Sequence, residues 1–100
     1  MKKDEEGRWT MGFPQALMAA LRGRMISRLG WNGKGQYVEC CRIPCYVRPD
    51  GKEKKLVGDR AFVFHSQDGT VQVGWLASQG DMLADDWTVL DAGADDEEAA

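Results

Sequence analysis

A glycine-rich segment, residues 30–35, holds the side chains best suited to bind a phosphorylated ligand. Its glycines, Gly33 among them, leave backbone N–H groups open to donate to phosphate, and Lys34 adds a positive charge. Asn32 both donates and accepts hydrogen bonds, and Trp31 offers a flat aromatic surface on which a base stacks. The segment is neither a P-loop nor a dinucleotide fingerprint, because no Ser or Thr follows the lysine and the glycine spacing is wrong. The alternative is an ordinary surface turn fixed by the tryptophan, since Asn-Gly turns are common.

A second block, residues 75–87, places Trp75 and Trp87 on either side of a short predicted helix that carries three acidic residues, Asp81, Asp85 and Asp86. A carboxylate in such a place accepts hydrogen bonds from ribose hydroxyls, as in dinucleotide sites. The alternative is a capped helix of purely structural role. Its apolar side chains would then pack in the core: Leu76, Met82 and Leu83.

The sequence offers no catalytic group and no metal site. The single histidine, His65, falls inside an apolar strand without a positioned partner, so we interpret it as a packed or edge histidine rather than a general base. Cys40 and Cys41 are adjacent and point to opposite faces of a strand, and Cys45 completes no CxxC pair. We therefore predict a binding protein, with no enzyme activity, metal or cofactor.

The charges are distributed unevenly along the chain. All 13 Lys and Arg residues lie at or before Arg60, whereas nine acids follow it. Without the charged ends, residues 1–6 and 95–98, the chain keeps 11 bases and 9 acids, a net charge of +2. That excess suits a small anionic ligand better than nucleic acid, which is typically bound by a larger positive charge. A basic face for nucleic acid remains the alternative, formed by Arg22, Arg24, Arg28, Lys34, Arg42 and Arg48.

The length of 100 residues predicts one domain. We expect an N-terminal extension over residues 1–10, with little to bury except Trp9. A single domain is expected over residues 11–91, and an acidic disordered tail over residues 92–100. No stretch is long and apolar enough to span a membrane, and no secretory signal follows Met1, so we expect a cytoplasmic protein.

The elements that must position these blocks follow from periodicity and turn residues. Apolar residues at helical spacing from Met11 predict a helix that Gly23 ends. Strands are predicted over residues 24–29 and 37–43 (continuing through 45–47), over 61–65 and 70–75 as a hairpin, and over 87–90. In the strand over 24–29, Ile26 and Arg28 share one side. Residues 49–51 are a turn with a solvated continuation over 52–55, and a capping box at Ser78 begins the short helix. The fold class is α+β, with an N-terminal helix packed on a mostly antiparallel sheet and a short helix before the last strand.

Three runs of the sequence together resemble the Thoeris anti-defense family two, a family of small phage and prophage proteins. They are residues 13–17 (FPQAL), 30–35 (GWNGKG) and 75–87 (WLASQGDMLADDW). The resemblance covers residues 11–90, and the second and third runs, in this order and near these distances, are specific together.

The resemblance implies a sponge that binds a cyclic ADP-ribose derivative made by a bacterial TIR-domain immune protein, in the host cytoplasm, without cleaving it. It further implies a homotetramer with pockets between protomers and, for some members, capture of cyclic dinucleotides at a separate site. By match to the motifs, Trp31 would stack on the ligand, Asn32, Gly33 and Lys34 would meet phosphate or ribose, and Asp81 would accept from hydroxyl or base donors. The supporting residues would be Trp75, Asp86 and Trp87.

The sequence departs from the family pattern in two places, and the first of them bears on the identity of the ligand. The segment over residues 37–60 is shorter than the family's usual one, and Pro14 replaces a usual glycine. The alternative function is a basic-faced module of phage or prophage origin that binds nucleic acid or another protein.

Overall fold

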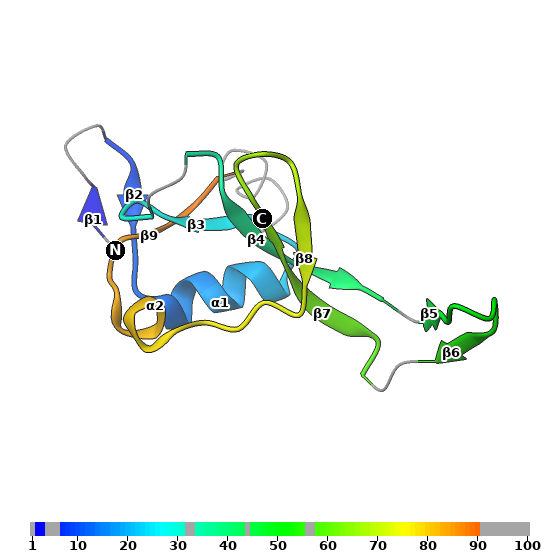
Figure 1. Ribbon diagram of the computed structural model, residues 1–100. Coiled ribbons are helices and arrows are strands. Elements are labelled where there is room, and N and C mark those ends of the chain that lie inside the picture. The colour runs from blue at the N-terminus through cyan, green and yellow to red at the C-terminus, as the bar shows by residue number, and fades with distance from the viewer. Residues whose placement is uncertain (1, 4–6, 32–33, 44, 56–57, 91–100) are drawn as a thin grey trace.

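The computed structural model describes residues 2–3, 7–31, 34–43, 45–55 and 58–90. It has the predicted α+β class, with mostly antiparallel strands and two helices (Figure 1). Within these residues, none of the helices has the length and apolar character needed to cross a membrane.

The main sheet has five strands in the order β8-β7-β4-β3-β9, and each neighbouring pair is antiparallel. The predicted hairpin over residues 61–75 is confirmed, because β7 pairs with β8 and Ser66 N donates to Thr70 O at 2.9 Å. The pairing of β3 with β9 joins residues about sixty positions apart, with Arg28 opposite Trp87. This pairing brings the two sequence blocks to one edge of the sheet. The strands are β3 (Ile26–Arg28), β4 (Tyr37–Arg42), β7 (Arg60–His65), β8 (Val71–Val73) and β9 (Trp87–Val89).

Helix α1 (Phe13–Leu21) begins with a proline in its first turn and ends as predicted, with Gly23 at a φ of 95°. The helix buries small residues rather than the leucines of its periodic pattern: Ala16 and Ala20 are fully buried, whereas Leu21 is 43% exposed. The two alanines allow α1 a close approach to the strands. The buried core that results consists of Ala16, Ala20, Ile26, Val38 and Trp87.

The N-terminal extension is structured, so α1 is not the first element. Strands β1 (Lys2–Lys3) and β2 (Trp9–Thr10) pair as a small hairpin. The expectation that Trp9 is the buried residue is wrong, because Trp9 is 51% exposed, whereas Thr10 is buried. The predicted tail over residues 92–100 lies outside the described residues.

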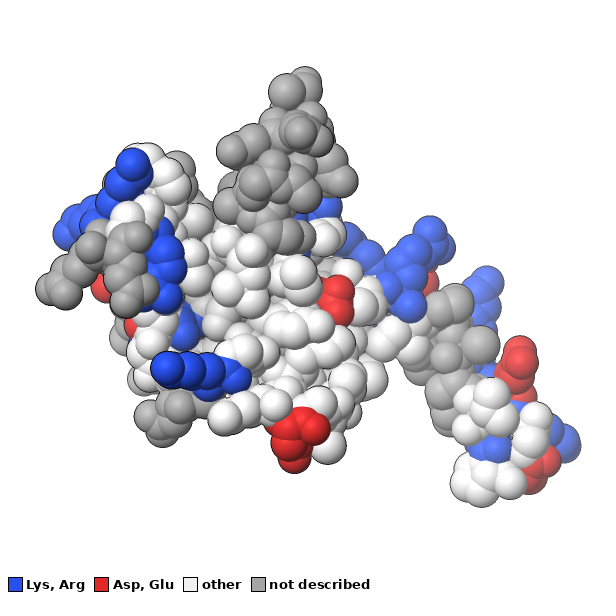
Figure 2. All heavy atoms as spheres, turned by 90° about the horizontal axis from the view of Figure 1, so that it is seen from above, with Lys and Arg blue, Asp and Glu red and all other residues white. Residues whose placement is uncertain are grey.

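Strands β5 (Cys45–Val47) and β6 (Glu53–Lys55) form a separate two-stranded sheet. The predicted continuation of β4 through residues 45–47 is therefore wrong. The predicted solvated continuation over 52–55 is exposed as expected, but residues 53–55 of it form a strand. Pro44, which has no N–H to donate, separates β4 from β5 in the sequence. The two strands project from the body as an arm, at the end of the molecule opposite the N-terminal hairpin (Figures 1 and 2).

Candidate functional site

The two sequence blocks meet at Arg28, the last residue of β3. Its guanidinium donates from Nη1 to Asp81 Oδ1 at 2.9 Å and from Nε to Asp86 Oδ1 at 2.8 Å. The three side chains are mostly buried, with 21% of Arg28, 12% of Asp81 and 29% of Asp86 exposed. Ion pairs at this depth are screened less than surface pairs, and losing one partner leaves an unpaired charge. Arg28 thus joins the strand before the glycine-rich segment to the second block.

The same two carboxylates position the start of the glycine-rich segment. Gly30 N donates to Asp86 Oδ2 at 2.8 Å, and Trp31 Nε1 donates to Asp81 Oδ1 at 3.1 Å. A Cβ atom at residue 30 would lie 2.7 Å from Asp86 Oδ2, so this approach needs glycine. The backbone and the tryptophan ring at the beginning of the segment are therefore held by hydrogen bonds to residues fifty or more positions away.

Asp81 is also part of the cap of helix α2 (Gln79–Leu83). The predicted capping box is present: Asp81 N donates to Ser78 Oγ at 3.0 Å, and Ser78 N donates to Asp81 Oδ2 at 3.1 Å. The carboxylate therefore accepts from Arg28, Trp31 and Ser78, and the side chain is nearly buried. Trp87 Nε1 donates to the backbone carbonyl of Asp81 at 2.8 Å. Asp81 thus links α2, β3, β9 and the glycine-rich segment.

The interpretation of α2 as a helix with an apolar buried side is wrong. Leu76 is 89% exposed and Leu83 is 83% exposed, while Asp81 takes the buried position. The helix is one turn long, so its contribution to the fold comes from the capped carboxylate rather than from an apolar face.

Trp31 lies edge-on against the aromatic core. Its ring centroid is 5.3 Å from that of Trp87, at an interplanar angle of 78°, and 6.4 Å from that of Trp75. Phe64 contacts it from β7 at 5.7 Å. Edge-to-face packing of this kind is favourable beyond the area it buries. Trp31 is therefore fixed by the aromatic core as well as by Asp81. These contacts are more extensive than a tryptophan that only anchors a surface turn would make. Trp87 is fully buried and serves the core.

A groove of about 640 Å³ lies beside this network. Trp31 and Lys34 line it from the glycine-rich segment, Ser27 and Arg28 from β3, and Thr88 from β9. Of the described residues that line it, the three with charged side chains are all basic: Arg8, Arg28 and Lys34. The volume falls in the range of small-molecule sites. A basic groove with an aromatic side chain is suited to a ligand that carries both a base and phosphate.

The structure brings most of the predicted site residues together. Trp31 and Lys34 line the groove, whereas Asp81, Asp86, Trp75 and Trp87 lie behind Trp31 and Arg28 and hold them. Asn32 and Gly33 lie outside the described residues. Sequence analysis missed the importance of Arg28, which it grouped with other basic residues. The sequence did contain a signal for this role. Arg28 lies on the same side of the predicted strand as the apolar Ile26, and a charge beside the core requires a partner.

Burial and hydrogen bonding have opposite effects on the two carboxylates. Desolvation alone raises the pKa of Asp81, but hydrogen bonds from Arg28, the Ser78 backbone and Trp31 outweigh it and hold the pKa below its ordinary value. For Asp86, burial is likewise outweighed by Arg28 and the Gly30 backbone, so its pKa is also lowered. The pKa of Arg28 is raised, chiefly by Asp86. The network is therefore ionised at neutral pH.

Acidification is expected to destabilise the protein through these carboxylates. Because their pKa values are lower in the folded state than in the unfolded state, their contribution is fully present above the unfolded value of about 3.9 and is lost as pH falls below it. Urea unfolding between about pH 6 and pH 3 measures this loss. Asp81→Asn should show a smaller loss than the unmutated protein, whereas Asp85→Asn, which removes an exposed carboxylate outside the network, should match it. Equal losses in all three proteins would contradict the assignment.

The histidine and the cysteines lie on the central strands of the main sheet. His65 stacks on Tyr37, with ring centroids 4.2 Å apart, as expected of a packed histidine, but the expectation that it has no positioned partner is wrong, because its Nε2 lies 2.5 Å from Glu39 Oε2. Cys40 and Cys41 carry free thiols, and burial raises the pKa of Cys41. In the part of the chain that the structure describes, no cluster of three His, Cys, Asp or Glu side chains is placed to hold a metal.

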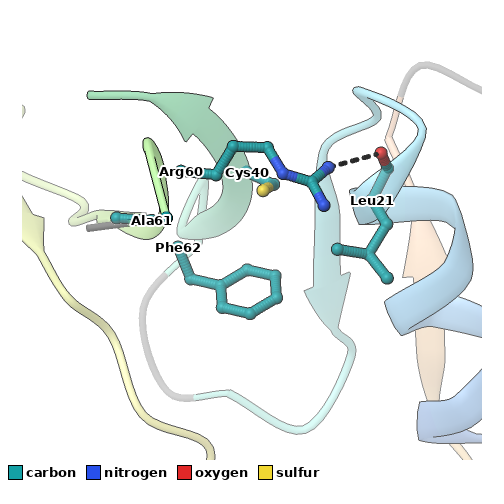
Figure 3. Close-up of a pocket in the computed structure, with 6 residues that line it drawn as sticks. Leu21, Cys40, Arg60, Ala61 and Phe62 are labelled. Atoms are coloured by element: carbon teal, nitrogen blue, oxygen red, sulfur yellow. Dashed lines mark hydrogen bonds between the residues drawn. The ribbon is translucent and has the colours of Figure 1, made fainter. Parts of the chain in front are cut away.

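A second, smaller hollow of about 240 Å³ lies where the end of α1 faces β4 and β7. Arg60 Nη1 donates to the Leu21 carbonyl oxygen at 3.4 Å, and Cys40 and Phe62 lie beside it (Figure 3). A cation at the last carbonyls of a helix is favourable for both the hydrogen bond and the helix dipole. We therefore assign Arg60 a role in capping α1.

Fold and site together define a small α+β protein with a basic, aromatic-lined groove at one edge of its main sheet. The family model described as "Tad2-like: Thoeris anti-defense 2-like domain" matches residues 11–90. The chain therefore belongs to the Thoeris anti-defense 2-like family, which supports an anti-defense role for a phage protein. A comparison with curated proteins finds no match.

Proposed function

We propose that this protein binds a cyclic ADP-ribose-derived signalling nucleotide in the groove and sequesters it without cleaving it. The observation that carries the proposal is the groove itself, which Trp31 and Lys34 line and in which Trp31 is held by Asp81. Sequestration would withhold the signal from its effector and so inhibit Thoeris defence in the cytoplasm of the bacterial host. Cyclic dinucleotides are a second ligand class to include in binding tests.

The chemistry of the groove supports holding rather than cleaving. The described side chains that line it provide hydrogen bonds, positive charge and an aromatic surface, and the described carboxylates near it are engaged by Arg28. A general acid or base must reach the bond to be broken in the correct protonation state. The paired, ionised Asp81 and Asp86 are suited to positioning other residues instead.

Sequestration requires tight binding. A sponge that competes with an effector for a scarce signal needs a dissociation constant near the nanomolar range, about −12 kcal/mol. A preformed groove with charge-assisted hydrogen bonds lowers the ordering cost of binding and makes this affinity attainable.

We also propose that the working form is a homotetramer. Several large apolar side chains are exposed on the single chain, and burying them between copies would be favourable. They lie on β8 and around α2: Val71 at 53%, Val73 at 60%, Leu76 at 89% and Leu83 at 83% exposure.

The test is recovery of intact ligand. The protein is incubated with glycocyclic ADP-ribose, separated from free nucleotide and then heat-denatured. We expect heating to release the nucleotide unmodified, in an amount equal to that retained by the protein. Liquid chromatography and mass spectrometry measure it. Release of a cleaved product would make the protein a hydrolase, and absence of any retained nucleotide would refute binding of this ligand.

A further inference from the structure

The main sheet has one edge that the described chain covers and one that it leaves open. At β9, the chain that follows β2 pairs with the strand, because Met11 N donates to Trp87 O at 2.9 Å and Trp87 N donates to Met11 O at 3.1 Å. At the other edge, β8 lies beyond β7, and no strand among the described residues pairs with its outer side (Figure 1). The open edge is therefore where another strand can extend the sheet.

The hydrogen bonds at the two ends of β8 show which backbone groups face β7. Before the strand, Ser66 N donates to Thr70 O at 2.9 Å. After it, Gly74 N donates to Phe62 O at 2.9 Å. The direction of the backbone groups alternates along an antiparallel strand, so those of Gln72, midway between residues 70 and 74, also face β7.

The two valines of β8 consequently direct their backbone groups away from the sheet. Val71 and Val73 lie opposite His65 and Val63 in the register, and by the same alternation their N–H and C=O groups point outward. The described residues offer these groups no second strand. The open edge thus presents two N–H donors and two C=O acceptors that are ready to pair.

The side chains of this edge are apolar and uncharged. Val71 is 53% exposed and Val73 is 60% exposed. Residues 69–80 contain no charged residue and no proline. Proteins commonly protect an exposed edge strand with a lysine, a proline or a bulge, because an unprotected edge pairs with other chains. The absence of charge and proline at β8 favours pairing with a further strand.

The symmetry of β8 favours a second copy of this chain as the source of that strand. In an antiparallel pair centred on Gln72, Val71 lies opposite the partner's Val73, and Val73 lies opposite the partner's Val71. Both pairs join outward-facing backbone groups, so each pair exchanges two N–H···O=C bonds. A shift of one residue would place valine opposite glutamine and lose these bonds. A patch that is complementary to itself in this way is what a twofold interface requires.

We propose that two copies of this protein pair through β8, antiparallel and centred on Gln72, so that their main sheets join into one continuous sheet. The valines of the two copies then pack beside each other across the junction and lose their exposure. The inference rests on the homotetramer of the proposed function, to which it assigns one interface, and it does not require nucleotide binding.

The first test removes an outward-facing donor from the edge. Val71→Pro deletes an N–H that β7 does not use, and proline is tolerated at such a position of an edge strand. Each dimer loses two hydrogen bonds, so we expect the dissociation constant of the pairing to rise at least tenfold. Sedimentation velocity at several protein concentrations measures it. Circular dichroism and urea unfolding show whether the variant is folded.

The matched control is Val47→Pro in the arm. Val47 is also an exposed strand valine, and Arg48 N donates to Lys52 O at 2.8 Å, so the N–H of Val47 points away from β6. The control therefore makes the same change at an outward-facing N–H outside the proposed interface. We expect it to assemble like the unmutated protein.

The second test examines the twofold register and does not depend on how the proline variant folds. In the proposed pairing, Gln72 lies opposite the partner's Gln72, in the type of antiparallel pair whose side chains are closest. Gln72→Lys and Gln72→Glu should each weaken the pairing about fivefold, because like charges then face each other. A mixture of the two variants should pair as tightly as the unmutated protein. Native mass spectrometry identifies the mixed pairs.

The outcomes distinguish this interface from the assembly and from the function. If a folded Val71→Pro variant assembles like the unmutated protein and Val47→Pro, pairing through β8 is refuted and the homotetramer stands. If mixing the charged Gln72 variants restores nothing, the register centred on Gln72 is wrong. If the unmutated protein is monomeric at every concentration, the interface and the homotetramer both fail, whereas recovery of intact nucleotide still tests sequestration.

Discussion

Replacing Arg28 with Met is expected to lower the free energy of unfolding by about 3 kcal/mol, near the lower limit for breaking a buried ion pair. The variant keeps the apolar stem but leaves Asp81 and Asp86 without their cation, while both carboxylates stay mostly buried. A loss of this size corresponds to a fall in melting temperature of about 15 °C for a domain of this length. Urea titration and thermal unfolding followed by circular dichroism measure it.

Arg42→Met is the matched control for this experiment. Arg42 also forms an ion pair with an aspartate, with its Nη2 3.0 Å from Asp59 Oδ2, but 77% of its side chain is exposed. Such surface pairs contribute less than about 1 kcal/mol. Arg28→Lys should fall between the two, because a lysine restores the charge but not two hydrogen bonds in different directions. A loss in Arg28→Met no larger than in Arg42→Met would show that the network does not hold the site together.

Replacing Trp31 with Ala is expected to abolish sequestration, with a loss of affinity of at least 100-fold. Stacking on an aromatic side chain contributes about 1–3 kcal/mol per base, and loss of the indole also frees the turn from Asp81. We expect a loss of binding energy at the upper end of this range, because the ring of Trp31 both lines the groove and contacts Trp75 and Trp87. Its removal therefore also disturbs the shape of the site. Calorimetric titration with glycocyclic ADP-ribose measures the change.

Two further variants separate stacking from general damage. Trp31→Phe keeps an aromatic surface but removes the Nε1 donor to Asp81, so it should retain part of the affinity. Trp9→Ala removes a tryptophan that is 51% exposed, in the N-terminal hairpin, and should bind as the unmutated protein does. Unchanged binding in a folded Trp31→Ala variant would place the ligand elsewhere. A gel shift that depends steeply on salt and is unaffected by this substitution would favour the nucleic-acid-binding alternative.

Local features of the sequence predicted much of the fold. The capping box at Ser78, the hairpin across residues 66–69 and the end of α1 at Gly23 each depend on residues within a few positions of one another, and all three are confirmed. Predictions that depended on which residues face the core were less successful. Leu76 and Leu83 are exposed, and Trp9 is exposed. Residues 53–55, predicted only as a solvated continuation of a turn, form a strand.

By itself, the sequence determined the α+β class, the family and the two blocks that form the candidate site, because periodicity, turn chemistry and motif spacing are local properties. Only the tertiary structure decided how the blocks meet. The pairing of β3 with β9 places Arg28 between Asp81 and Asp86, and the β2–β9 contact brings Arg8 to the groove. Such contacts between residues far apart in the chain are set by sheet topology and by the need to pair buried charges. Asp81, which the motifs suggested as a ligand contact, accepts a hydrogen bond from Trp31 in the folded protein and so fixes the tryptophan that lines the groove.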